Sequence, residues 1–251
     1  MAAGVNIWLG NVSTDPATAG NWSKTPEAGD TLRFDATAVK NCAGGAVGVQ
    51  VASVTITRDC SINFGTSIES PLVLDCSAGV MDEGTGSGFF SIANATSWYV
   101  HNTGTRYIDG IAGTAGALTI DASSSSIYVG PNIAAAARFA KITVIRGTVT
   151  LTKVEALAGG GAAPALSMTG GTVDAWDALA AVTVEAGLLR QHSQNITTLV
   201  LSTGGSLDAS DHPGLTIGTT TMYDGSSITD PLNAITYTAP IVNKGSTISV
   251  N

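Results

Sequence analysis

The sequence contains few charged side chains and no cluster of basic ones. Only 12% of its 251 residues are charged, about half the usual share of a soluble domain. Lys and Arg number 11 against 19 Asp and Glu, which gives a formal net charge of −8. A nucleic-acid partner requires a basic stripe that neutralises phosphates. The composition therefore argues against nucleic acid as a partner.

Long apolar runs are also missing, and no secretory signal is visible in the sequence. No run of about 18 apolar residues occurs, so we expect no transmembrane helix and no membrane partner. The first basic residue is Lys24, whereas a secretory signal begins with a positively charged segment. We therefore expect synthesis in a host cytoplasm, with release by a route that needs no signal, such as lysis.

Motifs that carry catalysis or hold cofactors are absent. The sequence has no phosphate-binding loop, no Gly-x-Ser-x-Gly and no His-Glu-x-x-His. The three histidines, His101, His192 and His212, are far apart in the chain and lack metal-binding spacing. We predict that the chain is not an enzyme and that it binds no cofactor and no metal.

Cysteine is rare, but its three positions are regular. Cys42, Cys60 and Cys76 each follow Asn or Asp, and the steps between them are 18 and 16 residues. We interpret them as small buried apolar residues, with one disulfide and a free thiol as the alternative. Because their spacing equals that of the repeats described next, they are also candidates to stack above one another in the interior.

Glycine is abundant, with 30 residues, and in the second half it recurs before short runs typical of β-strands. The steps between successive repeats are 24, 16, 18, 20 and 20 residues. Alternating apolar segments precede most of these glycines, as in residues 142–145. Each unit therefore reads as a strand, a glycine corner, a second strand and a loop. The repeats begin at Gly147, Gly171, Gly187, Gly205, Gly225 and Gly245.

A unit of this size cannot bury an apolar face alone, whereas stacked units can. We therefore predict a single-domain, all-β parallel β-helix, and the variable steps favour a right-handed coil. The alternative is an antiparallel β-sandwich or jelly roll, although only Asp109-Gly110 and Asp224-Gly225 offer two-residue hairpin turns. The alternation places four side chains inside, namely Val149, Val173, Leu207 and Ile248, and leaves Thr148, Thr172 and Ser206 outside or at corners.

The two ends differ from the body. Residues 1–40 contain Trp8, Trp22 and Phe34, and we predict a cap or attachment segment there, with these aromatic residues as partner-binding candidates. Residues 41–234 form the predicted solenoid body, with two predicted excursions on its side: one or two helical turns within residues 131–141 and a Gly/Ala loop at residues 156–164. Residues 235–251 form predicted closing strands.

The N-terminal segment combines a Trp, then Asn-Trp-Ser at residues 21–23, Pro-x-x-Gly-Asp at 26–30 and apolar-x-Phe-Asp at 32–35. This pattern resembles the start of β-helical proteins carried by bacteriophages and by some bacterial surface proteins. The resemblance covers about 30 residues and the repeats that follow. It implies a structural role in a virion or on a cell surface, often as a trimer, and it defines no site residues.

Two groups of polar residues are candidates for chemistry. Asp208, Asp211 and His212 form the densest polar group, which reads either as a hydrolytic site or as a loop that Pro213-Gly214 turns. Asp174 and Asp177 flank Trp176, which reads either as a solvated corner or as a platform for a sugar. In both cases we expect the structural role.

The leading hypothesis is a non-enzymatic virion protein that decorates a capsid as a homotrimer bound to the major capsid protein. A tail-associated position is a variant of the same hypothesis. One alternative is a tailspike-like module that binds or cleaves carbohydrate at a receptor. The other alternative is a bacterial surface adhesin.

Overall fold

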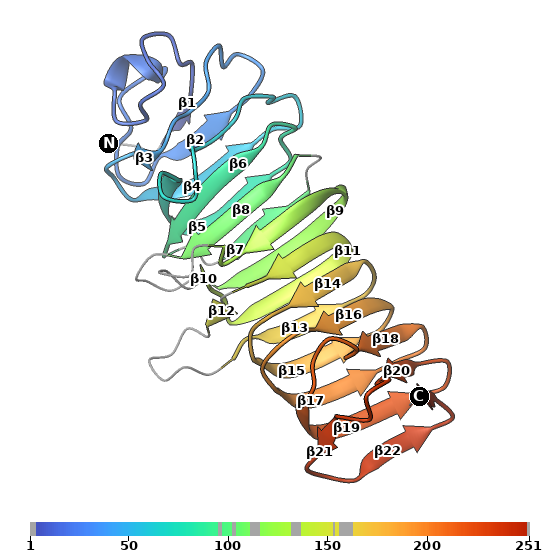
Figure 1. Cartoon of the computed structure of the whole chain (residues 1–251). Helices are drawn as coiled ribbons and strands as arrows, with labels where there is room; N and C mark the ends of the chain where they lie inside the picture. The colour runs from blue at the N-terminus through green and yellow to red at the C-terminus, as the bar shows by residue number, and fades with distance from the viewer. Residues whose placement is uncertain are drawn as a thin grey trace.

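The chain forms one elongated β-solenoid with almost no helix. The computed structural model describes residues 4–94, 97–101, 104–110, 116–131, 137–152, 154–155 and 163–249. Within these residues, twenty-one strands join into one continuous sheet that coils along the rod, and its two termini lie at opposite ends (Figure 1). The one helical element there is a 3-10 turn at Ala19–Asn21.

The sheet folds into two walls that face each other across the core. The first wall contains β1 (Val5–Ile7), β2 (Thr31–Phe34), β4 (Val51–Ile56), β7 (Ser97–Val100), β13 (Ala165–Met168), β15 (Leu179–Val184), β17 (Ile196–Leu201), β19 (Thr216–Tyr223), β21 (Thr236–Tyr237) and β22 (Ile241–Lys244). The second wall contains β3 (Gly45–Ala46), β6 (Gly88–Ala93), β8 (Arg106–Gly110), β14 (Thr172–Ala175), β16 (Gly187–Gln191), β18 (Gly205–Asp208), β20 (Ser227–Thr229) and β23 (Thr247–Ser249).

Three long strands bend through a corner and contribute to both walls: β5 (Leu72–Asp82), β9 (Ala117–Val129) and β11 (Lys141–Leu151). Two short strands, β10 (Ala137–Arg138) and β12 (Val154–Glu155), pair beside the rod. Every pairing between these strands is parallel, so the prediction of a parallel β-helix is confirmed and the antiparallel sandwich is excluded. The right-handed coil stays a prediction.

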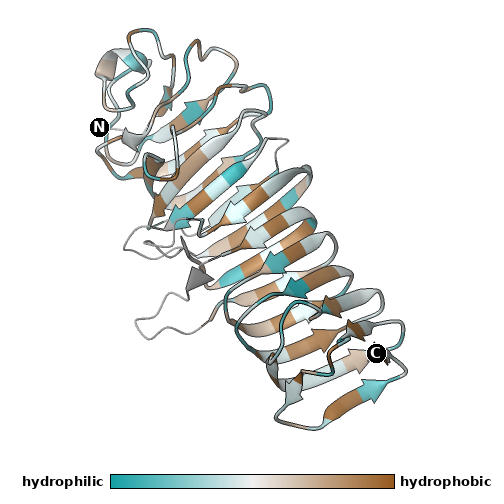
Figure 2. Ribbon diagram, viewed as in Figure 1, coloured by the Kyte–Doolittle hydropathy of each residue, from teal (hydrophilic) through white to brown (hydrophobic). Residues whose placement is uncertain are grey.

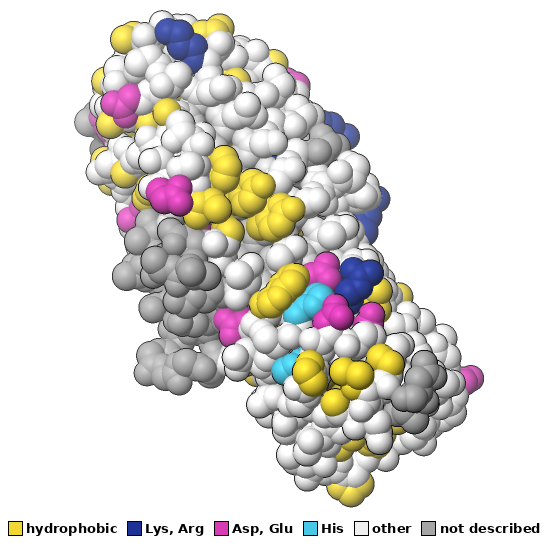
Figure 3. Space-filling view, viewed as in Figure 1, with side chains coloured by type: hydrophobic (Ala, Val, Ile, Leu, Met, Phe, Trp, Pro, Cys, Tyr) yellow, Lys and Arg dark blue, Asp and Glu magenta, His cyan; other side chains and the backbone are white. Residues whose placement is uncertain are grey.

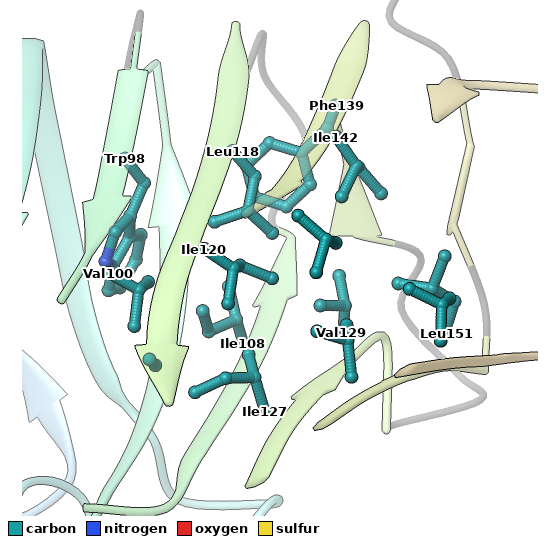
Figure 4. Packing of buried hydrophobic residues seen from close by; sticks show 14 of the residues in the cluster. Trp98, Val100, Ile108, Leu118, Ile120, Ile127, Val129, Phe139, Ile142 and Leu151 are labelled. Atoms are coloured by element: carbon teal, nitrogen blue, oxygen red, sulfur yellow. The ribbon is translucent and has the colours of Figure 1, made fainter. Parts of the chain in front are cut away.

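Alternation along each strand builds the core. In β9, Leu118 and Ile120 are fully buried whereas Thr119 between them is partly exposed. The same two-residue period runs through successive strands as bands of apolar residues (Figure 2). Side chains from both walls meet in the centre (Figure 4). Burial of one such side chain stabilises the fold by about 1.5–3 kcal/mol. The apolar interior extends along the rod.

The predicted inward register of the second wall is confirmed. Val149, Val173 and Leu207 are fully buried, and Ile248 packs against the core at the C-terminal end. Thr148 and Thr247 are exposed, and the equivalent residues of the turns between them are partly exposed. One column of opposed residues runs through six strands: Val149, Val173, Leu189, Leu207, Ile228 and Ile248.

Glycines form one corner of the rod, as the repeats predicted. Gly147, Gly171 and Gly187 have φ of 109°, 78° and 96°, values that L side chains rarely adopt. A Cβ on Gly171 would lie 2.5 Å from the Gly147 carbonyl oxygen, and one on Gly187 would lie 2.4 Å from the Gly171 carbonyl oxygen. Consecutive turns can therefore approach at this corner only because side chains are missing.

The cysteines are buried, but they do not stack. Cys42, Cys60 and Cys76 are fully buried free thiols, which confirms the apolar interpretation. Burial raises the pKa of Cys60 and of Cys76 to about 11. The predicted stack is wrong, because Cys42 lies opposite Phe64 and Cys76 lies opposite Val51. A loop of variable length between the strands shifts each cysteine to a different place in its turn.

Two predicted excursions lie largely outside the described residues. A helical turn was expected within residues 131–141, of which 132–136 are not described, and residues 137–138 form β10. The Gly/Ala loop expected at residues 156–164 is described only for its last two residues.

Candidate binding site

The outward face of the second wall carries a compact group of polar and aromatic side chains. We call Asp174, Trp176, Arg190, His192 and Asp211 the Asp174 cluster. Asp174 and Arg190 are opposed residues of β14 and β16. Trp176 and His192 follow these strands directly, and Asp211 comes from the loop after β18. Three consecutive turns therefore build the cluster, although its members are spread over 38 positions of the sequence (174 to 211).

Asp174 is the centre of the cluster. Its Oδ1 accepts hydrogen bonds from Arg190 Nη1 at 3.3 Å and from His192 Nε2 at 3.1 Å. His192 Nδ1 lies 3.6 Å from Asp211 Oδ2, so the imidazole bridges two carboxylates. The Trp176 and His192 rings stack with centroids 4.1 Å apart and an interplanar angle of 12°. These contacts hold the rings and the carboxylate in one fixed arrangement.

The backbone under Trp176 is fastened as well. The Trp176 amide donates to the Leu151 carbonyl at 2.8 Å, and the Ser193 hydroxyl donates to the Trp176 carbonyl. The Gln191 side chain donates to the Asp177 carbonyl at 3.0 Å. Trp176 itself is 41% exposed, so a rigid corner presents its indole ring to solvent.

A row of stacked aromatic rings lies on the same wall. Phe89, Tyr107 and Tyr128 are opposed residues of β6, β8 and β9. Their ring centroids are 4.6 Å and 4.8 Å apart, with interplanar angles of 12° and 8°. Figure 3 shows hydrophobic side chains grouped near β6 and β8, and farther toward the C-terminal end a group of histidine, acidic and basic side chains. Both groups are accessible from one side of the rod.

The residues singled out for possible hydrolysis separate in the structure. Asp208 Oδ1 accepts hydrogen bonds from the amide and the hydroxyl of Ser210. His212 Nε2 lies 3.1 Å from the Gln194 carbonyl oxygen, and Asp211 turns toward His192. The geometry thus gives these groups turn-forming and positioning contacts, whereas the platform at Trp176 keeps its exposed ring.

His101 belongs to a second charged group at the edge of the first wall. It lies 3.9 Å from Glu83 and, through Nε2, 3.4 Å from Arg146 Nη2. Arg146 in turn pairs with Asp121, whose carboxylate accepts from the Tyr99 hydroxyl at 3.3 Å. These side chains are partly exposed, from 14% for Asp121 to 50% for Arg146, and such surface pairs contribute about 0–1 kcal/mol each.

The three predicted partner-binding aromatics lie inside the N-terminal end. Trp8 and Phe34 are 0% exposed and Trp22 is 4% exposed. Trp8 packs edge-on to Trp22 with ring centroids 5.1 Å apart, and Phe34 contacts both. The indole nitrogens donate to backbone carbonyls at 3.1 Å and 2.9 Å. The rings close the apolar core, and the partner-binding role of residues 1–40 stays a prediction.

Polar residues of the N-terminal segment secure this cap. The side-chain oxygen Oδ1 of the buried Asn21 accepts hydrogen bonds from the backbone amides of Val12 and Ser13 at 2.9 Å and 2.8 Å. A hydrogen bond from Lys24 at 2.9 Å, with others from the Gly4 and Glu27 amides, lowers the pKa of Asp30 to about 2. The Asn-Trp-Ser and Gly-Asp elements of the sequence therefore organise the loops around the aromatic cap.

One buried ion pair was missed by the sequence analysis. Asp82 and Arg106 are both 0% exposed and form a bidentate contact, with Arg106 Nε 2.6 Å from Oδ2 and Nη2 2.9 Å from Oδ1. Arg106 also donates to the carbonyls of Gly84 and Gly86, and its guanidinium lies 5.6 Å from the Phe90 ring centroid. The pair joins the two walls through the core.

No group of three His, Cys, Asp or Glu side chains within the described residues is arranged to hold a metal ion. No described helix is long and apolar enough to cross a membrane. Comparison of the chain with protein-family models, with curated proteins and with solved structures finds no match.

Proposed function

We propose that this chain is a non-enzymatic structural protein of a virion that decorates the outer surface of the capsid as a homotrimer. The solenoid supports the structural part of the proposal, because its core is continuous and its backbone is hydrogen-bonded from turn to turn. The virion part rests on the N-terminal pattern, which resembles the start of bacteriophage β-helix proteins. Symmetry multiplies weak contacts on a shell.

The exposed valines of the N-terminal segment carry the proposal. Outward residues of the first wall are mostly small or hydroxyl-bearing, such as Thr119, Ser167 and Thr183. In the N-terminal segment Val12 and Val39 are 63% and 67% exposed, the highest values among the large hydrophobic side chains of the described residues, and Val5 is 58% exposed, as is Leu232 in the body. Exposed apolar side chains next to one another are typical of an interaction surface.

Two of these valines belong to chain segments that are hydrogen-bonded to each other. Lys40 Nζ donates to the Val12 carbonyl at 3.1 Å, and the Val39 amide donates to the Leu9 carbonyl at 2.9 Å. Both belong to the segment that the aromatic cap fixes to the rod. Attachment through residues 1–40 therefore uses exposed valines, and the buried aromatic residues support them from beneath.

Two measurements test the proposal: cosedimentation of the protein with shells assembled from the major capsid protein, and sedimentation equilibrium of the free protein. The proposal predicts that the free protein is a trimer and that its binding to shells saturates. Val12→Asp combined with Val39→Asp should abolish binding, whereas Leu232→Asp, at a 58% exposed residue near the other end, should not. The proposal is contradicted if the doubly substituted protein still binds shells, or if the free protein is a monomer and its binding does not saturate.

A further inference from the structure

We propose that the second wall contains a binding site for uncharged saccharides, between the free face of Tyr128 and the Asp174 cluster. This inference goes beyond attachment to a shell and uses a different part of the chain. Tyr128 ends the aromatic row, because the next opposed residue along the rod is Thr150. Asp174 follows Thr150 in the same column. A short side chain therefore separates two groups of large ones.

The strand register gives the distance between Tyr128 and the Asp174 cluster. Tyr128, Thr150 and Asp174 are consecutive partners in parallel strands, so two strand spacings, roughly 10 Å, separate the first from the last. In the neighbouring column Trp176 follows Thr152 and the glycine at position 130. The surface between Tyr128 and the Asp174 cluster is thus made of small residues, and aromatic rings lie on both sides of it.

The aromatic rings supply the apolar part of saccharide recognition. The face of an aromatic ring carries negative charge density, and its apolar area is large and rigid. The C–H groups on one side of a pyranose ring are weakly positive and fit such a face. Trp176 is stacked on His192 on one side, and its 41% exposure leaves ring surface available to a ligand.

The Asp174 cluster supplies the polar part. Asp174 uses Oδ1 for Arg190 and His192, and its Oδ2 has no hydrogen-bond partner among the described residues. The same part of the structure gives no hydrogen-bond partner to Trp176 Nε1. A carboxylate oxygen accepts from a hydroxyl, and indole and guanidinium groups donate to one. Paired donors and acceptors beside an aromatic ring match the alternating hydroxyls of a sugar.

Charge selects the class of saccharide. Asp174, Asp208 and Asp211 lie on this part of the wall, Arg190 is beside Asp174 and opposite Asp208, and His192 lies between two carboxylates. The whole chain carries a formal net charge of −8. Acidic polysaccharides and nucleic acids are repelled by such a field, whereas a neutral polysaccharide is not.

The experiment is affinity electrophoresis of the full chain through gels that contain a neutral glucan, mannan or galactan, with polygalacturonate as the acidic comparison. At least one neutral polymer should retard the wild type. Trp176→Ala should weaken this retardation about fivefold or more, a change that corresponds to about 1 kcal/mol, the lower end of what one aromatic side chain contributes when a nucleobase stacks on it. Trp176→Phe should retain most of it, and Asp174→Asn should weaken it.

Tyr223→Ala is the matched control, because Tyr223 is 39% exposed and lies on the first wall near the other end. It should leave retardation unchanged, and thermal melting should confirm that every variant is folded. The proposal is overturned if no neutral polymer retards the chain, if polygalacturonate retards it more, or if Tyr223→Ala and Trp176→Ala act alike. Shell binding is measured with the Val12 and Val39 variants, so the two proposals fail independently.

Discussion

Replacing Asp82 by Asn should be among the most destabilising polar substitutions in this protein. The change keeps the shape of the side chain but leaves the guanidinium of Arg106 in the core without its counterion. Both side chains are 0% exposed and their closest contact is 2.6 Å, so no water screens the charge that remains. Removal of one partner from a buried pair costs about 3–5 kcal/mol, a large part of the free energy of unfolding of a typical domain.

Guanidinium chloride unfolding followed by far-UV circular dichroism measures this cost, provided that the slope of the transition stays constant. Arg106→Met should cost a similar amount, and the double variant should cost clearly less than the sum because neither charge is left alone. Arg58→Met is the surface control, since Arg58 is 75% exposed and 3.6 Å from Glu83; it should change stability by about 1 kcal/mol or less. A cost below about 1 kcal/mol for Asp82→Asn would refute the buried pair.

Three further substitutions test other contacts. Gly171→Ala should destabilise more than Gly29→Ala in thermal melts, because both have positive φ but only the Cβ at position 171 meets a backbone carbonyl, at 2.5 Å; equal effects would contradict the tight corner. Thr220→Val should stabilise by about 1 kcal/mol, since the buried Thr220 hydroxyl has no partner among the described residues, and a loss of stability would contradict this. Lys24 and two backbone amides lower the pKa of Asp30 to about 2. The stabilisation that the Asp30 carboxylate contributes to the fold is therefore present above about pH 4 and is lost as the pH falls toward 2. Asp30→Asn should remove this pH dependence of stability in acid titrations followed by Trp fluorescence.

The fold was predictable because its two signals are local. Alternation in segments such as residues 142–145 identifies the inward side of a strand without any knowledge of its partner. The glycines at 147 and 171 mark a corner where the backbone adopts positive φ. The same reasoning failed for Cys42 and Cys76, since equal spacing in sequence does not give equal position in the turn when loops differ in length.

The candidate site was only partly predictable. Asp174 and Trp176 are close in sequence, so the platform could be named as an alternative to the solvated corner that we expected there, but Arg190 and Asp211 join it only through stacking of turns. Sequence spacing cannot give that contact until the register of every intervening loop is known.

The buried ion pair had a signal that alternation could have revealed. Asp82 continues the inward positions that precede it in β5, and the strand of Arg106 is otherwise apolar at its inward positions. Burial of two opposite charges at inward positions one turn apart is unfavourable unless the two side chains form an ion pair. Their pairing needed the three-dimensional register, because 24 residues separate them.

The register of the second wall underlies the corner, the buried column and the saccharide site, and a distance measurement tests it directly. Spin labels on Thr148→Cys paired with Ser227→Cys, both outward residues, span four strand pairings, and Thr148→Cys paired with Thr247→Cys spans five. The native thiols are buried and do not compete for label. Pulsed electron spin resonance should give distances near roughly 19 Å and 24 Å, one strand spacing apart. Equal distances, or a shorter one for the pair farther along the chain, would contradict the solenoid register.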